Sequence, residues 1–126
     1  MVIKMKKVLI ILLFCLMLTG CGSKESSMIK SGNITCNQKD TILKYDNAIL
    51  VDVRSVLEYN SGHLDNAINI PLDNVVEDIK TLDNVNLDTP IIVYCKSGAR
   101  SSQAFEKLKS EGYKNIYNLG AMSSCN

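Results

Sequence analysis

The stretch from residue 91 to residue 105 most constrains how this chain can fold. The apolar run 91–94, typical of a buried strand, ends on Cys95; a short loop of mostly small residues containing Gly98 follows, and then a helical pattern begins. Where a strand enters a helix through a tight turn, the unpaired N–H groups of the first helical turn converge near the end of the strand. The positive potential at that point favours a thiolate over a thiol. The stretch therefore predicts an anion-binding loop around a nucleophilic cysteine.

The other residues of the loop agree with this prediction. Lys96 and Arg100 add positive charge, and the guanidinium of Arg100 offers a fork of donors suited to an oxyanion. Gly98 permits a backbone angle that a side chain would oppose. The alternative is that Cys95 is a small buried residue that closes a core strand, as free cysteines often do. The combination of Gly98 and Arg100 after the cysteine favours the nucleophile.

Short strands and short helices alternate along the rest of the chain. Strands are expected at 48–53, 67–70, 91–95 and 115–119, and helices after Thr35, after Ser55, over 74–82 and over 101–111, with Gly112 as the last C-cap. This alternation predicts an α/β domain whose mostly parallel sheet is covered by helices on both faces. Ligands of such sheets bind beyond the carboxyl ends of the strands, where Asp52, Arg54 and Cys95 lie.

Three segments in this order resemble the rhodanese (sulfurtransferase) family, and the resemblance covers about residues 34 to 120. They are Ile49-Leu50-Val51-Asp52-Val53-Arg54 followed by Glu58-Tyr59, then Gly62-His63-Leu64-Asp65-Asn66-Ala67-Ile68-Asn69-Ile70-Pro71, and the loop Cys95-Lys96-Ser97-Gly98-Ala99-Arg100-Ser101. The resemblance implies a five-stranded parallel sheet flanked by helices. The chain departs from the family pattern after Gly120, where many members carry a second glycine and a downstream aromatic residue.

The resemblance also implies a mechanism. The Cys95 thiolate would take the sulfane sulfur of a small anionic donor such as thiosulfate, forming a persulfide, and would pass it to a thiol or cyanide-like acceptor. Arg100 would hold the sulfonate of the donor, and the loop from Lys96 through Ser97, Gly98 and Ala99 to Ser101 would stabilise the persulfide. Asp52, Arg54 and His63 would brace the active-site edge rather than take part in the chemistry.

Two other classes of function stay open at this stage. One is a non-catalytic rhodanese-like module that binds an anion or a protein partner. The other is a thiol-redox or phosphatase-like enzyme, which the loop disfavours because four residues separate Cys95 from Arg100, whereas phosphatases of related fold use five. We expect neither a metal nor another cofactor. The oligomeric state does not follow from the sequence, and a monomer is the simpler expectation.

The N-terminal segment predicts export. Lys4, Lys6 and Lys7 precede an apolar run at 8–18 that is short for a membrane span and suits the core of a signal peptide. Leu18-Thr19-Gly20-Cys21 resembles a bacterial lipobox, which implies cleavage after residue 20 and lipidation of Cys21. We therefore expect a signal peptide at 1–20, a lipidated tether at 21–33 and the domain at 34–126. The protein would be extracytoplasmic and held at the membrane by lipid.

Charge and cysteine content complete the prediction. The chain has 14 basic and 13 acidic residues, and removal of the leader leaves 11 against 13, so nucleic acid is not an expected partner. In an oxidising compartment, the neighbouring first and last strands of the rhodanese arrangement would allow a Cys36–Cys125 disulfide. Two alternatives stay open: Cys125 could resolve the Cys95 persulfide, or it could be unpaired.

Overall fold

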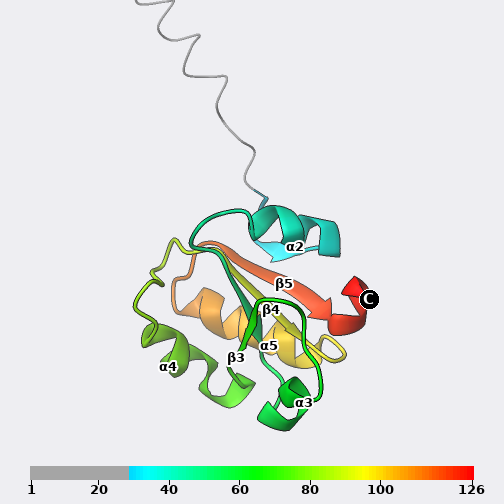
Figure 1. Ribbon diagram of the computed structural model, residues 1–126. Helices are drawn as coiled ribbons and strands as arrows, with labels where there is room; N and C mark the ends of the chain where they lie inside the picture. Colours follow the sequence, from blue (N-terminus) through cyan, green and yellow to red (C-terminus); the bar gives the residue numbers. More distant parts are fainter. Residues whose placement is uncertain (1–28) are drawn as a thin grey trace, which may run out of the picture.

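The computed structural model describes residues 29–126 (Figure 1). Five strands and four α-helices alternate in this range, together with two short 3-10 helices. In chain order they are β1 (Gly32–Asn33), α2 (Cys36–Ile42), β2 (Ile49–Asp52), α3 (Val56–Asn60), β3 (Ala67–Asn69), η2 (Leu72–Asn74), α4 (Val75–Lys80), β4 (Ile91–Cys95), α5 (Ala99–Ser110), β5 (Ile116–Ala121) and η3 (Met122–Cys125).

The strands form one sheet in the order β1-β5-β4-β2-β3, and every neighbouring pair is parallel. The predicted α/β class and the five-stranded parallel sheet are therefore confirmed. All five residues of β4 are buried, which explains why this strand reads as a continuous apolar run. Because β4 is central, its carboxyl end places Cys95 between the ends of β5 and β2.

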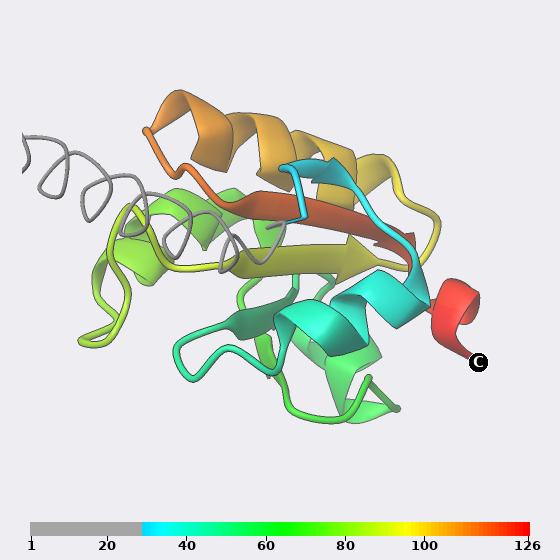
Figure 2. The same cartoon turned by 90° about the horizontal axis from the view of Figure 1, so that it is seen from above.

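Helices cover both faces of the sheet, as Figure 2 shows. Alternate residues of the strands supply two cores. Val93 and Cys95 face α4 and α5 on one side, where Ile79 and Leu108 complete the cluster. On the other side Ile92, Tyr94 and Tyr117 pack against Ile42 of α2. Cys95 therefore points toward the α5 layer.

Capping boxes begin two of the helices at the predicted residues. The hydroxyl of Thr35 accepts a hydrogen bond from the N–H of Gln38, whose side chain accepts one from the N–H of Thr35. Ser55 and Glu58 repeat this exchange at α3. Each box satisfies N–H groups that would otherwise lack partners. The box at α3 begins that helix four residues after the end of β2, at the edge of the sheet where the strands end.

The structure corrects three predicted boundaries. Residues 32–33, assigned to the tether, form β1, which pairs with β5. This strand carries no apolar run that would reveal it in the sequence. Helix α5 begins at Ala99, two residues earlier than predicted, because Gly98 is its N-cap. Strand β5 continues through Ala121, past a register shift opposite Val93 and Tyr94.

The predicted signal peptide, Cys21 and residues 22–28 of the tether lie outside the described residues. Within residues 29–126, no helix has the length and apolar character needed to cross a membrane.

A disulfide joins Cys36, at the start of α2, to Cys125 in η3. The Cα atoms are 5.3 Å apart, and the sequence separation is 89 residues. Of the three possibilities set out for these cysteines, the structure shows the covalent link between the two ends of the domain. Cys95 is the free cysteine of the described residues.

Reduction of this disulfide is expected to destabilise the domain strongly. Opening a closed loop of 89 residues restores freedom to the unfolded chain, so the free energy of unfolding should fall by about 3–5 kcal/mol. Urea denaturation with and without dithiothreitol measures the change. The double variant Cys36→Ser, Cys125→Ser is the control and should not respond to the reductant. Equal unfolding midpoints for oxidised and demonstrably reduced wild type would contradict the prediction.

Candidate active site

The sulfur of Cys95 lies in a cradle of backbone N–H groups. The N–H of Gly98 donates to Sγ over 2.9 Å, and the N–H of Ser101 donates over 3.4 Å. The residue has no exposed surface. Backbone donors around a buried sulfur stabilise its anion, because the interior lacks the water that would otherwise solvate the charge.

Two opposing effects decide the pKa of Cys95. Burial raises the pKa and is the largest single influence, but hydrogen bonds from Ser101, Gly98 and Ser97 lower it. Together these bonds outweigh the burial, so the pKa lies below its ordinary value. The thiolate is the nucleophilic form of cysteine, and the cradle therefore prepares Cys95 for attack.

Gly98 gives the loop its shape. Its φ of +98° lies in the left-handed region, where L side chains are strained. A Cβ at this position would meet backbone atoms only at 3.8–3.9 Å, so the backbone angle rather than space requires glycine. The carbonyl of Gly98 accepts from the N–H and the hydroxyl of Ser102 and from the hydroxyl of Ser101. The turn is thus tied to the first turn of α5.

Arg100 pairs with Glu58 across the site. Its Nη1 and Nη2 donate to Oε1 and Oε2 over 2.7 and 3.0 Å. The bond from Arg100, opposed in part by desolvation and assisted by Ser55, lowers the pKa of Glu58 to about 2. A guanidinium has further N–H donors, so this pair leaves Arg100 able to contact an anion as well. The pair links α3 to the first turn of α5.

Asp52 and Arg54 form a buried ion pair at the carboxyl end of β2. The carboxylate accepts from the backbone N–H and from Nε and Nη2 of Arg54, at 2.7–3.0 Å. Nη2 also donates to the carbonyl of Gly62 over 2.6 Å. The amide of Asn69 donates to the carbonyls of Asp52 and Arg54. These bonds join the ends of β2 and β3 to the segment before His63.

His63 is exposed, and its ring stacks on that of Tyr59 with centroids 3.9 Å apart. Its Nδ1 lies 2.9 Å from the carbonyl oxygen of Leu64. The next N–H, that of Leu64, donates to the hydroxyl of buried Tyr94 over 3.0 Å. These contacts belong to the loop before β3 and suit a structural role for the histidine.

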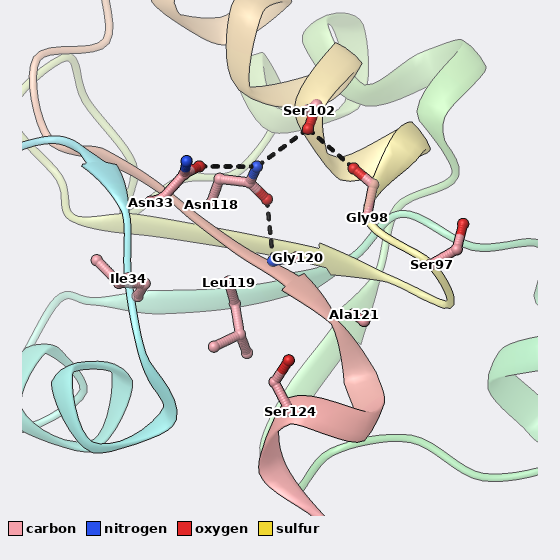
Figure 3. A pocket seen from close by; sticks show the side chains of 10 residues that line it. All are labelled: Asn33, Ile34, Ser97, Gly98, Ser102, Asn118, Leu119, Gly120, Ala121 and Ser124. Atoms are coloured by element: carbon pink, nitrogen blue, oxygen red, sulfur yellow. Dashed lines mark hydrogen bonds between the residues drawn. The ribbon is translucent and has the colours of Figure 1, made fainter.

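Two cavities flank the loop. The larger, about 440 Å³, lies on the β5 side and is lined by Ser97, Gly98, Ser102, Asn118 and Ser124 among others (Figure 3). The smaller, about 180 Å³, lies on the β2 side and is lined by Val53, Ser55, Pro71, Leu72, Asp73 and Arg100. Lys96 is exposed at the tip of the loop.

Sequence reasoning missed two features of this site. It did not pair Glu58 with Arg100, although placing α3 and α5 after adjacent strands could have suggested the pair. It also gave no role to Asn118, whose amide donates to the hydroxyl of Ser102 in the first turn of α5. Within residues 29–126, no cluster of three or more histidine, cysteine or acidic side chains could hold a metal ion.

Comparison with known proteins identifies the family. The model of the rhodanese-like domain matches residues 36–123. The chain belongs to the rhodanese-like domain family. The matched segment contains the Asp52–Arg54 pair, Glu58, His63 and the loop from Cys95 to Ser102.

Relatives in this family have different names. The chain is 42% identical over 72 residues to the thiosulfate sulfurtransferase PspE of Escherichia coli, covering 57% of this chain and 68% of that protein. It is 32% identical over 93 residues to a tRNA uridine(34) hydroxylase of Buchnera aphidicola, covering 68% of this chain and 28% of that protein. The chain spans about a quarter of the length of the hydroxylases that it matches.

Solved structures share the fold. A structure titled rhodanese with anions, from E. coli, is 36% identical, with a TM-score of 0.58 over 61% of this chain and 89% of that one. The human single-domain sulfurtransferase TSTD1 has a TM-score of 0.66 over 73% of this chain and 92% of that one. At 24% identity, the human structure supports the fold alone.

Neutralising Glu58 should produce a stability difference that depends on pH. The pKa of Glu58 is about 2 in the folded protein, below its ordinary value of 4.5. The ion pair therefore stabilises the fold fully above about pH 4.5, and this contribution is lost as the pH falls through about 2. Glu58→Gln keeps the capping box but removes the charge.

Denaturant unfolding of wild type and Glu58→Gln between pH 7 and pH 2 measures this difference. We expect wild type to be the more stable above pH 4.5 and the two curves to converge toward pH 2. Glu106→Gln, on the exposed face of α5, is the matched control. A difference between wild type and Glu58→Gln that does not change with pH would contradict the prediction.

Proposed function

We propose that this protein is a sulfurtransferase that carries a sulfane sulfur on Cys95. One observation carries the proposal: the N–H groups of Gly98 and Ser101 converge on a buried cysteine sulfur at the carboxyl end of the central strand. The same cradle that stabilises a thiolate can stabilise the negative charge of a persulfide. The family supports sulfur transfer, and the similarity to a thiosulfate sulfurtransferase supports thiosulfate as a donor.

The reaction has two balanced steps. The Cys95 thiolate attacks the outer sulfur of thiosulfate, an S–S bond forms to Sγ, and sulfite leaves with the electron pair of the broken S–S bond. The product is the Cys95 persulfide anion. A thiophilic acceptor such as cyanide then attacks the outer sulfur, takes it as thiocyanate, and returns the thiolate.

Arg100 is proposed to attract and orient the anionic donor beside the loop. It lines the smaller cavity and keeps N–H donors beyond those that bind Glu58. Asp73 lines the same cavity, and its carboxylate offsets part of this positive charge. The exposed Lys96 adds positive potential at the tip of the loop. Donor binding therefore relies on contacts with the loop more than on overall charge.

Two other functions, a non-catalytic binding module and a tRNA hydroxylase, can be compared with sulfur transfer. A binding module without catalysis would leave Cys95 unmodified by thiosulfate. Several relatives carry the name tRNA uridine(34) hydroxylase, but the chain spans only about a quarter of their length, so we do not propose that activity for it. The N–H groups around Cys95 support sulfur transfer, because they can stabilise the persulfide anion.

Treatment with thiosulfate should add one sulfur atom to Cys95. Intact mass spectrometry of the purified chain, followed by peptide mapping, detects the adduct and locates it. Cyanide should remove the atom as thiocyanate. Cys95→Ser, which keeps Cys36, Cys125 and the leader cysteines, is the matched control and should gain nothing at this peptide. No adduct on wild type with a demonstrably reduced Cys95 would exclude thiosulfate as donor and favour the binding module.

We also propose that the protein is exported and anchored through a lipid on Cys21. The lipobox-like sequence before Cys21 supports this placement. When expressed in a bacterium, the wild type should reach the membrane fraction with a mature N-terminus at a diacylglyceryl-modified Cys21, seen by mass spectrometry. Cys21→Ser should lose the modification, whereas Cys15→Ser, within the leader, should keep it. An unmodified Cys21 in the mature wild type would contradict this proposal.

A further inference from the structure

The larger cavity beside the catalytic loop has no role in the steps proposed above. It holds about 440 Å³ on the β5 side of the loop (Figure 3). Its wall includes Gly98, whose N–H donates to Sγ of Cys95, and the preceding residue, Ser97. A cavity of this volume suits a small organic molecule and is larger than thiosulfate or cyanide requires. Space for a larger reactant therefore adjoins the cradle that holds the sulfur.

The two cavities that flank the loop differ in charge. Arg100 and Asp73 line the smaller one. Among residues 29–126, only uncharged side chains line the larger one, and the exposed Lys96 is not among them. An anion that entered the larger cavity would lose water without gaining an opposite charge, a cost that a neutral polar molecule avoids. The loop thus separates a side suited to an anionic donor from a side suited to an uncharged ligand.

Several polar groups of the larger cavity can bind a ligand. Ser97 on the loop and Ser124 on η3 are exposed, so their hydroxyls can both donate and accept (Figure 3). Asn33 is also exposed, and its Oδ1 accepts from the amide of Asn118, which leaves the NH₂ group of Asn33 for a ligand. Asn118 itself is held in place, because its amide also donates to the hydroxyl of Ser102.

The η3 wall of this cavity is fixed by the rest of the domain. Ser124 precedes Cys125, whose disulfide to Cys36 ties η3 to the start of α2. Met122, at the other end of η3, packs with Cys125 against the core on the α2 side of the sheet. A wall that is already ordered loses little conformational freedom when a ligand binds. The cavity is therefore preformed for binding.

We propose that the larger cavity is the subsite for the sulfur acceptor, and that this acceptor is an uncharged thiol of the peptide type, a cysteine side chain flanked by peptide bonds. Each peptide bond carries one N–H donor and one carbonyl acceptor, which the hydroxyls of Ser97 and Ser124 and the amide of Asn33 can satisfy. The inference rests on the proposed function and names the acceptor class of its second step.

The transfer to such a thiol balances without another reagent. The acceptor thiol gives its proton to the outer sulfur of the Cys95 persulfide, and the acceptor thiolate then attacks that sulfur. A new S–S bond forms as the bond to Sγ breaks. Cys95 leaves as a thiolate with the electron pair of the broken bond, and the acceptor leaves as a persulfide.

Discharge of the persulfide by N-acetylcysteinamide, a neutral thiol between two amide groups, tests the inference. The full chain is loaded with thiosulfate and freed of excess donor, and mass spectrometry follows the loss of the sulfur and verifies that the Cys36–Cys125 disulfide stays intact. The rate constant for this thiol is divided by that for cyanide, which is too small to need the cavity. The ratio cancels any difference in the reactivity of the persulfide itself.

Neighbouring residues of η3 provide a matched pair of variants. Ser124→Leu removes a hydroxyl from the cavity and fills part of its space, so we expect the ratio to fall about tenfold. Ser123→Leu places the same side chain at the adjacent exposed position, which does not line the cavity, and should keep the wild-type ratio. Equal ratios in the two variants would overturn the inference.

The charge of the acceptor gives a second comparison. N-acetylcysteine carries a carboxylate in place of one amide of N-acetylcysteinamide. At equal concentrations of thiolate, wild type should react about fivefold faster with the amide, because the carboxylate loses water in a cavity lined by neutral side chains. A rate with N-acetylcysteine that equals or exceeds the rate with the amide would also overturn the inference.

Cyanide distinguishes failure of this inference from failure of the proposed function. If cyanide discharges the persulfide but the thiol results go against the expectation, sulfur transfer by Cys95 stands and only the acceptor subsite is wrong. If thiosulfate leaves no persulfide on Cys95, the proposed function fails before any acceptor is added, and the acceptor subsite falls with it.

Discussion

A sulfur anion held away from water needs hydrogen-bond donors, and in this domain the backbone supplies them. The donors are in place because Gly98 adopts a left-handed angle, which lets the chain turn from β4 into α5 around the Cys95 sulfur. Burial alone would favour the neutral thiol. Most other contacts of the site serve this turn: three donors meet the Gly98 carbonyl, and the Arg100–Glu58 pair holds the first turn of α5 against α3.

The parallel sheet explains why distant segments meet at this loop. The carboxyl ends of β2, β4 and β5 share one edge, so the Asp52–Arg54 ion pair, Cys95 and the bulge after Asn118 become neighbours of one site. The Cys36–Cys125 disulfide lies next to this edge, because η3 directly follows the carboxyl end of β5 and is bonded to the start of α2. The disulfide and the candidate active site therefore occupy neighbouring parts of the domain.

The sequence predicted the features that depend on local pattern. The buried run of β4, the N-cap at Thr35, the capping box at Ser55 and the glycine turn after Cys95 all follow from residue type and spacing. Features that depend on tertiary placement were harder to predict. Strand β1 is a two-residue strand that exists only because β5 offers it an edge, and the partner of Arg100 lies 42 positions away in another helix.

The central claim is that the amide cradle receives the transferred sulfur. A crystal structure of the chain after exposure to thiosulfate tests it most directly. We predict density for a second sulfur bonded to Sγ of Cys95, within hydrogen-bond distance of backbone N–H groups of residues 96–101 and with sulfite departed. Density for an unmodified, reduced Cys95 would contradict the account, and so would a sulfur adduct turned away from the loop amides.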